Sequence, residues 1–225
     1  MSELIRIPGR LYRLWLAGVA GYLVGSILTA DLATKAAGRR SGQSVDLRAV
    51  GSGNPGAANA IQNLGAGWAA AILAGDIGKG AAAAQAGRWI GGSAGAYVAA
   101  TAAVAGHCFP AWSGFRGGKG VATSAGTTLA VFPTYVPVDV GVVGVSWFAA
   151  RHAGKATAAA SSLFVVAAFL WKWRQWPTLW GPRPTWGLPL YAAATTAMIA
   201  YRFRSAPAHM GNRRAAPLSR EAEDA

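Results

Sequence analysis

The sequence has little charge, few acidic residues and almost no cysteine. Charged residues make up 13% of its 225 residues, against about 25% in ordinary soluble domains. The single cysteine, Cys108, excludes an intrachain disulfide, so cysteine usage gives no information on the redox compartment. With 21 Lys and Arg against 8 Asp and Glu, the net charge is +13. The basic residues lie in short clusters between long apolar runs, which indicates membrane loops and not a nucleic-acid groove. We therefore expect no nucleic-acid partner.

Long apolar runs are what the sequence has in abundance, and 53% of the residues are hydrophobic. A membrane-spanning helix needs about 20 mostly apolar residues. The run 121–150 is too long for one helix and contains Pro133 and Pro137, so we expect two short helices joined by a turn. The sequence thus predicts an all-α fold, a polytopic membrane bundle of about seven transmembrane helices. The expected helices cover residues 14–34, 64–87, 91–110, 121–133, 137–150, 157–172 and 187–203.

The distribution of Lys and Arg predicts the orientation of this bundle. If the N-terminus is outside and the C-terminus inside, thirteen basic residues lie on the inner side and seven on the outer side, as the positive-inside rule requires. The first apolar run also fits a secretory signal peptide, but the six runs that follow favour a retained helix. We expect residues 1–204 to form one integral-membrane domain and residues 205–225 to form a disordered cytoplasmic tail, because the tail has no apolar period.

A glycine-rich stretch, "GSGNPGAAN", follows the first basic cluster. Gly51, Gly53 and Gly56 have the spacing G-x-G-x-x-G, and Asp76 lies twenty residues further on, as in a dinucleotide-binding fingerprint. That fingerprint must follow a buried strand and open a helix. Here the preceding "DLRAV" is short and polar, Pro55 interrupts the loop and Asp76 falls within an apolar run. Dinucleotide binding is therefore excluded.

The same stretch remains a candidate anion or polyol site. Its backbone N–H groups can line a small concavity, and the polar residues Ser52, Asn54 and Asn59 with Gly53 are the binding candidates. A plain turn between helices has a similar composition, so this alternative stays open.

A second loop lies within "GHCFPAWSGFRGGKGVATSAG". Its core "GFRGGKG" resembles a Walker A loop, but Gly120 stands where Ser or Thr would bind magnesium, so a nucleotide triphosphatase is not expected. Lys119 and Arg116 still offer positive charge, and the glycines expose amides at the start of the next helix. The phosphate-binding candidates in this loop are Arg116, Gly117, Gly118, Lys119, Gly120 and Thr123.

Two ionisable residues fall inside one apolar run, in "LAGDIGKGA". Asp76 and Lys79 are three residues apart, so they share a helix face and can pair. Ionisable residues at membrane depth are commonly functional, although a purely structural ion pair is the alternative.

The three histidines give no metal site. His107 ends a helix next to the second loop, where it can position or protonate a reacting oxygen or simply cap the helix. Cys108 is its neighbour in sequence and points about 100° away on a helix, so we expect it only to pack. His152 and His209 have no companions at metal-ligand spacing, and no metal is expected.

The stretches "DLRAVGSGNPGAAN", "GDIGKG" and "GHCFPAWSGFRGGKGVATSAG" resemble the motifs of the integral-membrane acyl-phosphate:glycerol-3-phosphate acyltransferases, the PlsY family of bacteria. The likeness runs from about Gly25 to Arg204. It implies transfer of a fatty acyl group from acyl phosphate to the 1-hydroxyl of glycerol 3-phosphate, which gives lysophosphatidic acid and phosphate for phospholipid synthesis. It also implies that no cofactor is needed. The family lacks the H-x-x-x-x-D motif of other glycerolipid acyltransferases, and this sequence lacks it too.

The resemblance further implies a multi-pass protein of the bacterial plasma membrane, with both glycine loops on the cytoplasmic side. The expected partners are acyl phosphate, glycerol 3-phosphate and membrane lipid, and we expect a monomer. Because both substrates are anions and phosphate is a good leaving group, holding and neutralising them matters more than a strong nucleophile. The catalytic candidates are Ser52, His107 and Lys119. The substrate-binding candidates are Gly53, Asn54, Asn59, Asp76, Lys79, Arg116, Gly117, Gly118, Gly120 and Thr123.

The sequence also departs from the family pattern. Ala58 and Gln62 stand where the first motif usually has Thr and Arg, and "YRFRSAPAH" has Phe203 and Ala206 where His and Asn are expected. Two alternatives follow: a diverged relative that is inactive or uses another polyol acceptor, and a small-anion transporter. Glycine-broken helices and intramembrane Asp and Lys also occur in transporters, but no inverted repeat is found here.

Overall fold

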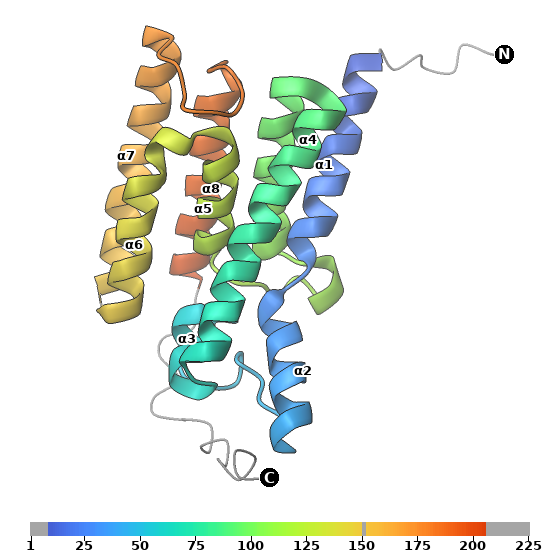
Figure 1. Cartoon of the computed structure of the whole chain (residues 1–225), viewed down its shortest axis with the longest axis vertical. Helices are drawn as coiled ribbons and strands as arrows, with labels where there is room; N and C mark the ends of the chain where they lie inside the picture. The colour runs from blue at the N-terminus through green and yellow to red at the C-terminus, as the bar shows by residue number, and fades with distance from the viewer. Residues whose placement is uncertain (1–8, 150–151, 206–225) are drawn as a thin grey trace, which may run out of the picture.

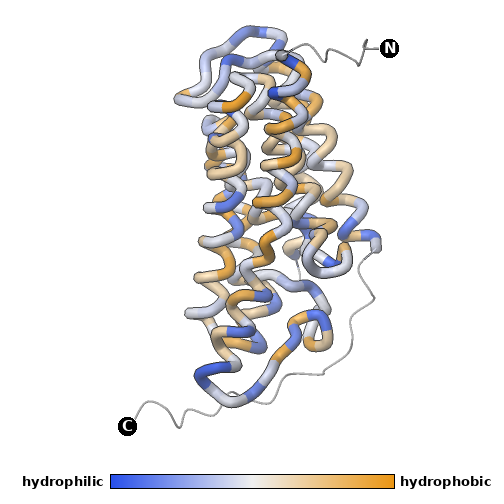
Figure 2. Tube along the Cα trace, turned by 90° about the vertical axis from the view of Figure 1, so that its right-hand side faces the viewer, coloured by the Kyte–Doolittle hydropathy of each residue, from blue (hydrophilic) through white to orange (hydrophobic). Residues whose placement is uncertain are grey.

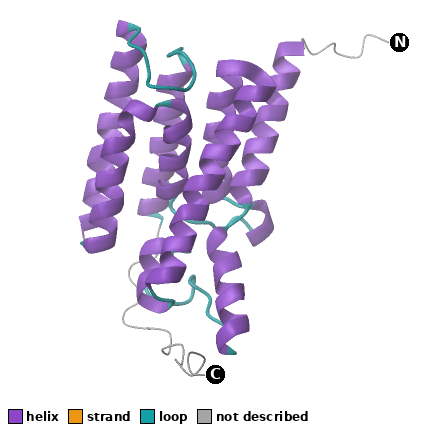
Figure 3. Ribbon diagram, in the orientation of Figure 1, coloured by secondary structure: helices purple, strands orange, loops and turns teal. Residues whose placement is uncertain are grey.

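The structure is a computed structural model that describes residues 9–149 and 152–205. All regular structure in these residues is helical, which confirms the predicted fold class (Figures 1 and 3). The helices are α1 (Gly9–Ser26), α2 (Thr29–Ser41), α3 (Ala57–Asn63), α4 (Ala66–Cys108), α5 (Val121–Val131), α6 (Val136–Phe148), α7 (Ala153–Arg174) and α8 (Gly187–Arg204), with short 3-10 turns η1 (Ala111–Ser113) and η2 (Pro133–Tyr135). Of the predicted tail only Ser205 is described, and His209 lies outside the described residues.

The long element α4 consists of two antiparallel helices. Its backbone is non-helical at Gly91 (φ −132°, ψ 20°) and Gly92 (φ 64°, ψ −149°), so the chain turns back there, at the upper end of Figure 1. A Cβ atom on Gly87 or on Gly95 would overlap the backbone of the other residue, so the two halves touch directly below the turn. These halves correspond to the predicted helices 64–87 and 91–110.

The predicted first helix, residues 14–34, is broken in the structure. Helix α1 ends at Ser26, Leu28 is extended (φ −83°, ψ 112°), and α2 starts at Thr29. The break frees the carbonyl group of Ile27, which accepts a hydrogen bond of 2.7 Å from Lys79 Nζ. Neither Ile27 nor Leu28 is a helix breaker, so the expectation of one continuous helix was wrong for a reason that lies in the tertiary structure.

Small residues bring α1 against the second half of α4. Cβ atoms on Gly21 and Gly25 would collide with the backbones of Ala99 and Ala103. Such close backbone approach is the usual way in which helices associate within a membrane, where no hydrophobic effect drives them together.

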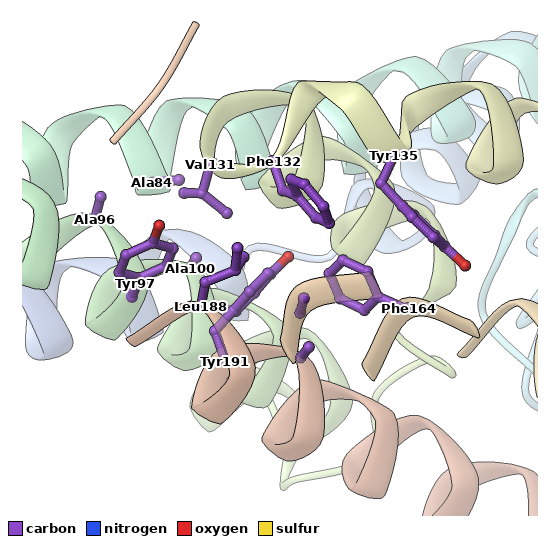
Figure 4. Packing of buried hydrophobic residues seen from close by; sticks show 12 residues of the cluster. Ala84, Ala96, Tyr97, Ala100, Val131, Phe132, Tyr135, Phe164, Leu188 and Tyr191 are labelled. Atoms are coloured by element: carbon purple, nitrogen blue, oxygen red, sulfur yellow. The ribbon is translucent and has the colours of Figure 1, made fainter. Parts of the chain in front are cut away.

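An aromatic cluster holds the other half of the bundle together (Figure 4). Phe164 of α7 lies between Tyr135 and Tyr191, with ring centroids 4.8 Å and 5.6 Å away, and Phe132 stacks on it at 6.1 Å. The cluster fixes η2, α7 and α8 relative to one another. Helix α5 follows the second glycine loop directly, and α8 contacts that loop through Arg202.

Apolar surface covers the outside of the bundle. The stretches Gly9–Ser41 and Ala153–Arg174 are long and apolar enough to cross a membrane, and Val121–Val131 and Pro133–Val145 are shorter apolar helices. Hydrophobic residues follow the helices and hydrophilic residues gather at the two ends and in the lower half (Figure 2). Only 17% of the apolar stretch of α7 is buried, as expected for a helix that faces lipid. The number of membrane crossings stays a prediction.

Candidate active site

Three ionisable side chains meet where the two halves of α4 pass the break between α1 and α2. Lys79 Nζ lies 2.8 Å from Asp76 Oδ1, which confirms the predicted pairing. The same nitrogen lies 2.7 Å from the carbonyl oxygen of Ile27 and 2.9 Å from His107 Nδ1. Thr29 donates a further hydrogen bond of 3.1 Å to Asp76. An ammonium group has three protons, so these three acceptors use all of them and Lys79 has none left for a ligand.

This arrangement determines which nitrogen of His107 carries the proton. Lys79 can only donate, so Nδ1 of His107 accepts and the ring proton lies on Nε2. Asp76 Oδ1 is 3.5 Å from Nδ1, where it acts through its charge. Nε2 has no hydrogen-bond partner in the part of the chain that the structure describes, and it is the atom that a side chain on Gly118 would strike first. The cluster therefore presents an N–H group to the second glycine loop.

The second loop, residues 109–120, is anchored from three sides. Tyr22 of α1 donates a hydrogen bond of 2.7 Å to the carbonyl of Phe109. The Gly118 amide donates to the carbonyl of His107 at 3.1 Å. Arg202 of α8 donates to the carbonyl of Gly118 at 3.1 Å and also to that of Gly117. The loop is thus anchored by hydrogen bonds to α1, α4 and α8.

The anchoring corrects one expectation and supports another. The Gly118 amide, predicted to face phosphate, is already used by His107. Among the described residues no partner is found for the amides of Gly117, Lys119 and Gly120, which lie next to the free amides at the start of α5. Gly120 has φ +84°, and a Cβ atom there would lie 2.8 Å from Cys108 Sγ. Amides grouped in this way at a helix N-terminus bind anions.

The two cations of the loop are placed differently. Lys119 Nζ lies 4.3 Å from the ring centroid of Phe203. Burial, and then the nearby charge of Arg202, lower the pKa of Lys119. The Arg116 side chain is exposed and has no partner within residues 9–149 and 152–205. Thr123, in contrast, is fully buried at the start of α5, and its hydroxyl has no hydrogen-bond partner among the described residues.

Asn59 organises the first glycine loop from inside. It is 3% exposed. Its side-chain nitrogen donates to the carbonyls of Leu47 (2.8 Å) and Val50 (3.1 Å), and its side-chain oxygen accepts from the Ser52 amide at 3.0 Å. With these bonds made, Asn59 shapes the loop and cannot at the same time orient a substrate, as the sequence had suggested.

Other groups in the first loop remain available. The Gly53 amide donates to Val50 at 3.0 Å, so it does not face a ligand. The Ser52 hydroxyl and the Asn54 side chain are half-buried, and neither has a hydrogen-bond partner among the residues described. No hydrogen bond joins them to the cluster of Asp76, Lys79 and His107 within the described chain.

Residues that sequence reasoning missed connect the two loops. Arg48 Nε donates 2.9 Å to the carbonyl of Arg116, and the Arg48 guanidinium pairs with Asp31. Arg202 holds the second loop from α8. In the sequence, Arg48 stood out only as an inner-loop charge and Arg202 only as an inner-loop charge retained in "YRFRSAPAH". Asp31 did not stand out at all, because each of these residues works through a partner distant along the chain.

In the described part of the chain, free amides, two cations without carboxylate partners and one imidazole N–H thus lie in or beside the second loop. The fold is that of a helical membrane protein, and the second loop is its candidate site for an anion.

The chain belongs to the glycerol-3-phosphate acyltransferase family, whose sequence model matches residues 15–212. A glycerol-3-phosphate acyltransferase from Rubrobacter xylanophilus is 43% identical over 152 residues, which are 66% of this chain and 71% of the relative. The predicted resemblance to the PlsY family is confirmed.

Solved structures agree with this assignment. The crystal structure of PlsY, an integral membrane glycerol 3-phosphate acyltransferase, in its glycerol 3-phosphate form is 29% identical, with a TM-score of 0.67 over 85% of this chain and 88% of that chain. Its lysophosphatidic acid form is 27% identical, with a TM-score of 0.64 over the same shares.

Proposed function

We propose that this protein transfers a fatty acyl group from acyl phosphate to the 1-hydroxyl of glycerol 3-phosphate. The products are lysophosphatidic acid and inorganic phosphate. Family membership supports the acyl transfer. The choice of acyl phosphate as the acyl donor rests on the second loop. There, free amides lie beside Lys119 and Arg116 and suit a phosphate group. No metal ligand set is found among the described residues.

The reaction needs little more than alignment and charge neutralisation. The 1-hydroxyl oxygen attacks the carbonyl carbon of acyl phosphate, and the bond from this carbon to the bridging phosphate oxygen breaks. The hydroxyl proton ends on the released phosphate. Lys119, Arg116 and the amides of Gly117 and Gly120 hold the acyl phosphate and stabilise the charge that builds up on the leaving phosphate. The acyl chain lies between the helices, open to lipid.

His107 acts in this mechanism as a donor and not as a base. Its Nε2–H faces the second loop, because Lys79 occupies Nδ1. A hydrogen bond from Nε2 to a phosphate or acyl oxygen strengthens as negative charge develops there. Ser52 and Asn54 orient glycerol 3-phosphate from the first loop, and the substrate phosphate takes the proton.

The membrane arrangement is proposed from the position of the loops and from the distribution of basic residues. Both glycine loops lie in the lower half of the bundle, opposite the connection between α7 and α8 (Figure 3). Because the sequence assigns thirteen basic residues to the inner side and seven to the outer side, we place the loops in the cytoplasm of a bacterium. The chain then crosses the plasma membrane seven times as one monomeric domain, residues 1–204, with its N-terminus outside.

Purified protein in detergent or lipid, given palmitoyl phosphate and glycerol 3-phosphate, tests the proposal by phosphate release and by formation of lysophosphatidic acid. Lys119→Ala is expected to abolish turnover, and Lys155→Ala, which removes an exposed lysine at the start of α7, to leave it unchanged. Phosphate release with another polyol but not with glycerol 3-phosphate would overturn the assignment of glycerol 3-phosphate as the acceptor. No release with any acceptor would overturn the enzymatic reading and leave the inactive relative or the anion transporter.

A further inference from the structure

One partly buried ion pair joins the segments that carry the two glycine loops. Arg48 Nη1 lies 2.7 Å from Asp31 Oδ1, and Arg48 Nη2 lies 3.1 Å from Asp31 Oδ2. Arg48 Nε donates to the carbonyl of Arg116 at 2.9 Å. Ser113 Oγ donates to Asp31 Oδ2 at 2.8 Å. All three guanidinium nitrogens and both carboxylate oxygens are therefore used.

The partners come from three parts of the chain. Asp31 lies in the first turn of α2, where the helix dipole favours a negative charge. Arg48 lies three positions before Gly51, the first residue of the first glycine loop, and Ser113 and Arg116 belong to the second loop. A guanidinium has the planar fork that this bidentate contact requires, which an ammonium lacks.

The pair is shielded enough to be held in one geometry. The side chains of Arg48 and Asp31 are 20% and 27% exposed. Burial lowers the pKa of Arg48, but the hydrogen bond and the charge of Asp31 outweigh this and raise it. Arg48 is therefore charged at neutral pH, as the ion pair requires.

We propose that Asp31 and Arg48 are positioning residues that clamp the first glycine loop to the second and so align the two substrates. The inference rests on the proposed function, in which each loop holds one substrate. Attack requires the hydroxyl oxygen to approach the acyl carbon closely, and a misplacement of about 1 Å can cost about 100-fold in rate. A clamp between the loops acts on this alignment and leaves the binding groups of each loop unchanged.

Loss of the clamp is therefore expected to lower kcat more than it raises KM. Asp31→Asn and Arg48→Lys should each reduce kcat by about 10- to 100-fold, while KM for either substrate changes by less than about threefold. Because both act on one contact, the double variant should be little worse than either single variant. Asp31→Glu, which retains the fork-to-carboxylate contact, should recover most of the rate.

Asp46→Asn is the matched control. Asp46 also lies near the Arg48 guanidinium, at 3.5 Å, but is 59% exposed, and its oxygen accepts the Arg48 backbone N–H. Asparagine retains that acceptor and removes the charge. This variant should keep kcat within about twofold of the wild type.

Hydrogen–deuterium exchange of the peptide covering residues 113–120 tests the clamp without turnover. Exchange is expected to be faster in Asp31→Asn and unchanged in Asp46→Asn. If the wild type shows no turnover, the proposed function fails while exchange still tests the clamp. The clamp is overturned if the Asp31→Asn variant shows unchanged exchange or unchanged kcat. It is also overturned if Arg48→Lys raises KM at constant kcat, and this result would make Arg48 a substrate ligand. A loss of kcat that merely follows the folded fraction, measured by thermal unfolding, also overturns it.

Discussion

Replacing Lys79 by methionine, which has a similar length and no charge, removes three hydrogen bonds at one point. The carbonyl of Ile27 loses its partner and Asp76 loses its cation, while Nδ1 of His107 becomes free. Removing one member of a buried ion pair costs about 3–5 kcal/mol. Asp76 keeps its bond from Thr29 and lies 3.5 Å from His107 Nδ1, so we expect a loss of about 3 kcal/mol, at the lower end of that range.

The same substitution reverses the hydrogen bonding of His107. With Lys79 gone, Asp76 is the nearest charged neighbour of His107 Nδ1, and its carboxylate can accept a hydrogen bond from an N–H group at that nitrogen. The ring proton therefore moves to Nδ1, and Nε2 can no longer donate to the second loop. Loss of one preorganised donor to developing negative charge costs about 100- to 1,000-fold in kcat.

Two measurements on the Lys79→Met variant separate these effects. Steady-state kinetics should show the loss in kcat, and ¹⁵N NMR of labelled histidine should show the proton on Nε2 in the wild type and on Nδ1 in the variant. The double variant Lys79→Met/Asp76→Asn removes both charges, so its stability should recover. Wild-type kcat in Lys79→Met, or a proton on Nδ1 in the wild-type protein, would refute the reasoning.

Three further predictions concern single residues. Burial and Arg202 lower the pKa of Lys119, so its side chain loses its proton at a lower pH than an exposed lysine does. In a pH profile, kcat/KM should therefore fall on the alkaline side. Lys119→Arg should move this alkaline decrease to higher pH. Gly120→Ala forces a side chain into a left-handed backbone (φ +84°) and against Cys108, at a strain of about 1–2 kcal/mol. The KM for acyl phosphate should therefore rise about tenfold. An unchanged KM would contradict the proposal that the amides of this loop bind acyl phosphate. Asp139 Oδ2 is buried and has no partner among the described residues; Asp139→Asn should raise the unfolding temperature in detergent by about 2–4 °C, and a lower value contradicts this.

Local spacing was enough to predict part of the site. Asp76 and Lys79 are three residues apart on a helix, so their pairing follows from helix geometry alone and is found at 2.8 Å. The second loop was recognisable because glycines and cations stand together immediately before a helix. The helices were recognisable from the length of the apolar runs, and the turn within α4 coincides with the adjacent Gly91 and Gly92.

The remainder depends on contacts that no local pattern encodes. The break after α1 involves Ile27 and Leu28, which are ordinary helix residues, and its freed carbonyl is satisfied by Lys79, 52 positions away. An asparagine in a glycine-rich loop can face a ligand or the protein interior, and the packing of α3 turns Asn59 inward. Arg48 and Asp31 are 17 positions apart, and they meet only because the loop between them closes.

The small number of acidic residues affects the charge balance of the candidate site. The described chain contains four carboxylates: Asp31, Asp46, Asp76 and Asp139. Asp31 and Asp76 are occupied by Arg48 and Lys79.

No carboxylate within the described residues therefore pairs with Lys119, Arg116 or Arg202, which lie in or beside the second loop. A carboxylate placed there would compete with phosphate for the same cations. Because the loop is anchored through the carbonyls of Gly117 and Gly118, its positive charge stays uncompensated without loss of shape. Two anionic substrates can then supply the missing negative charge, and the protein need not reorganise to receive them.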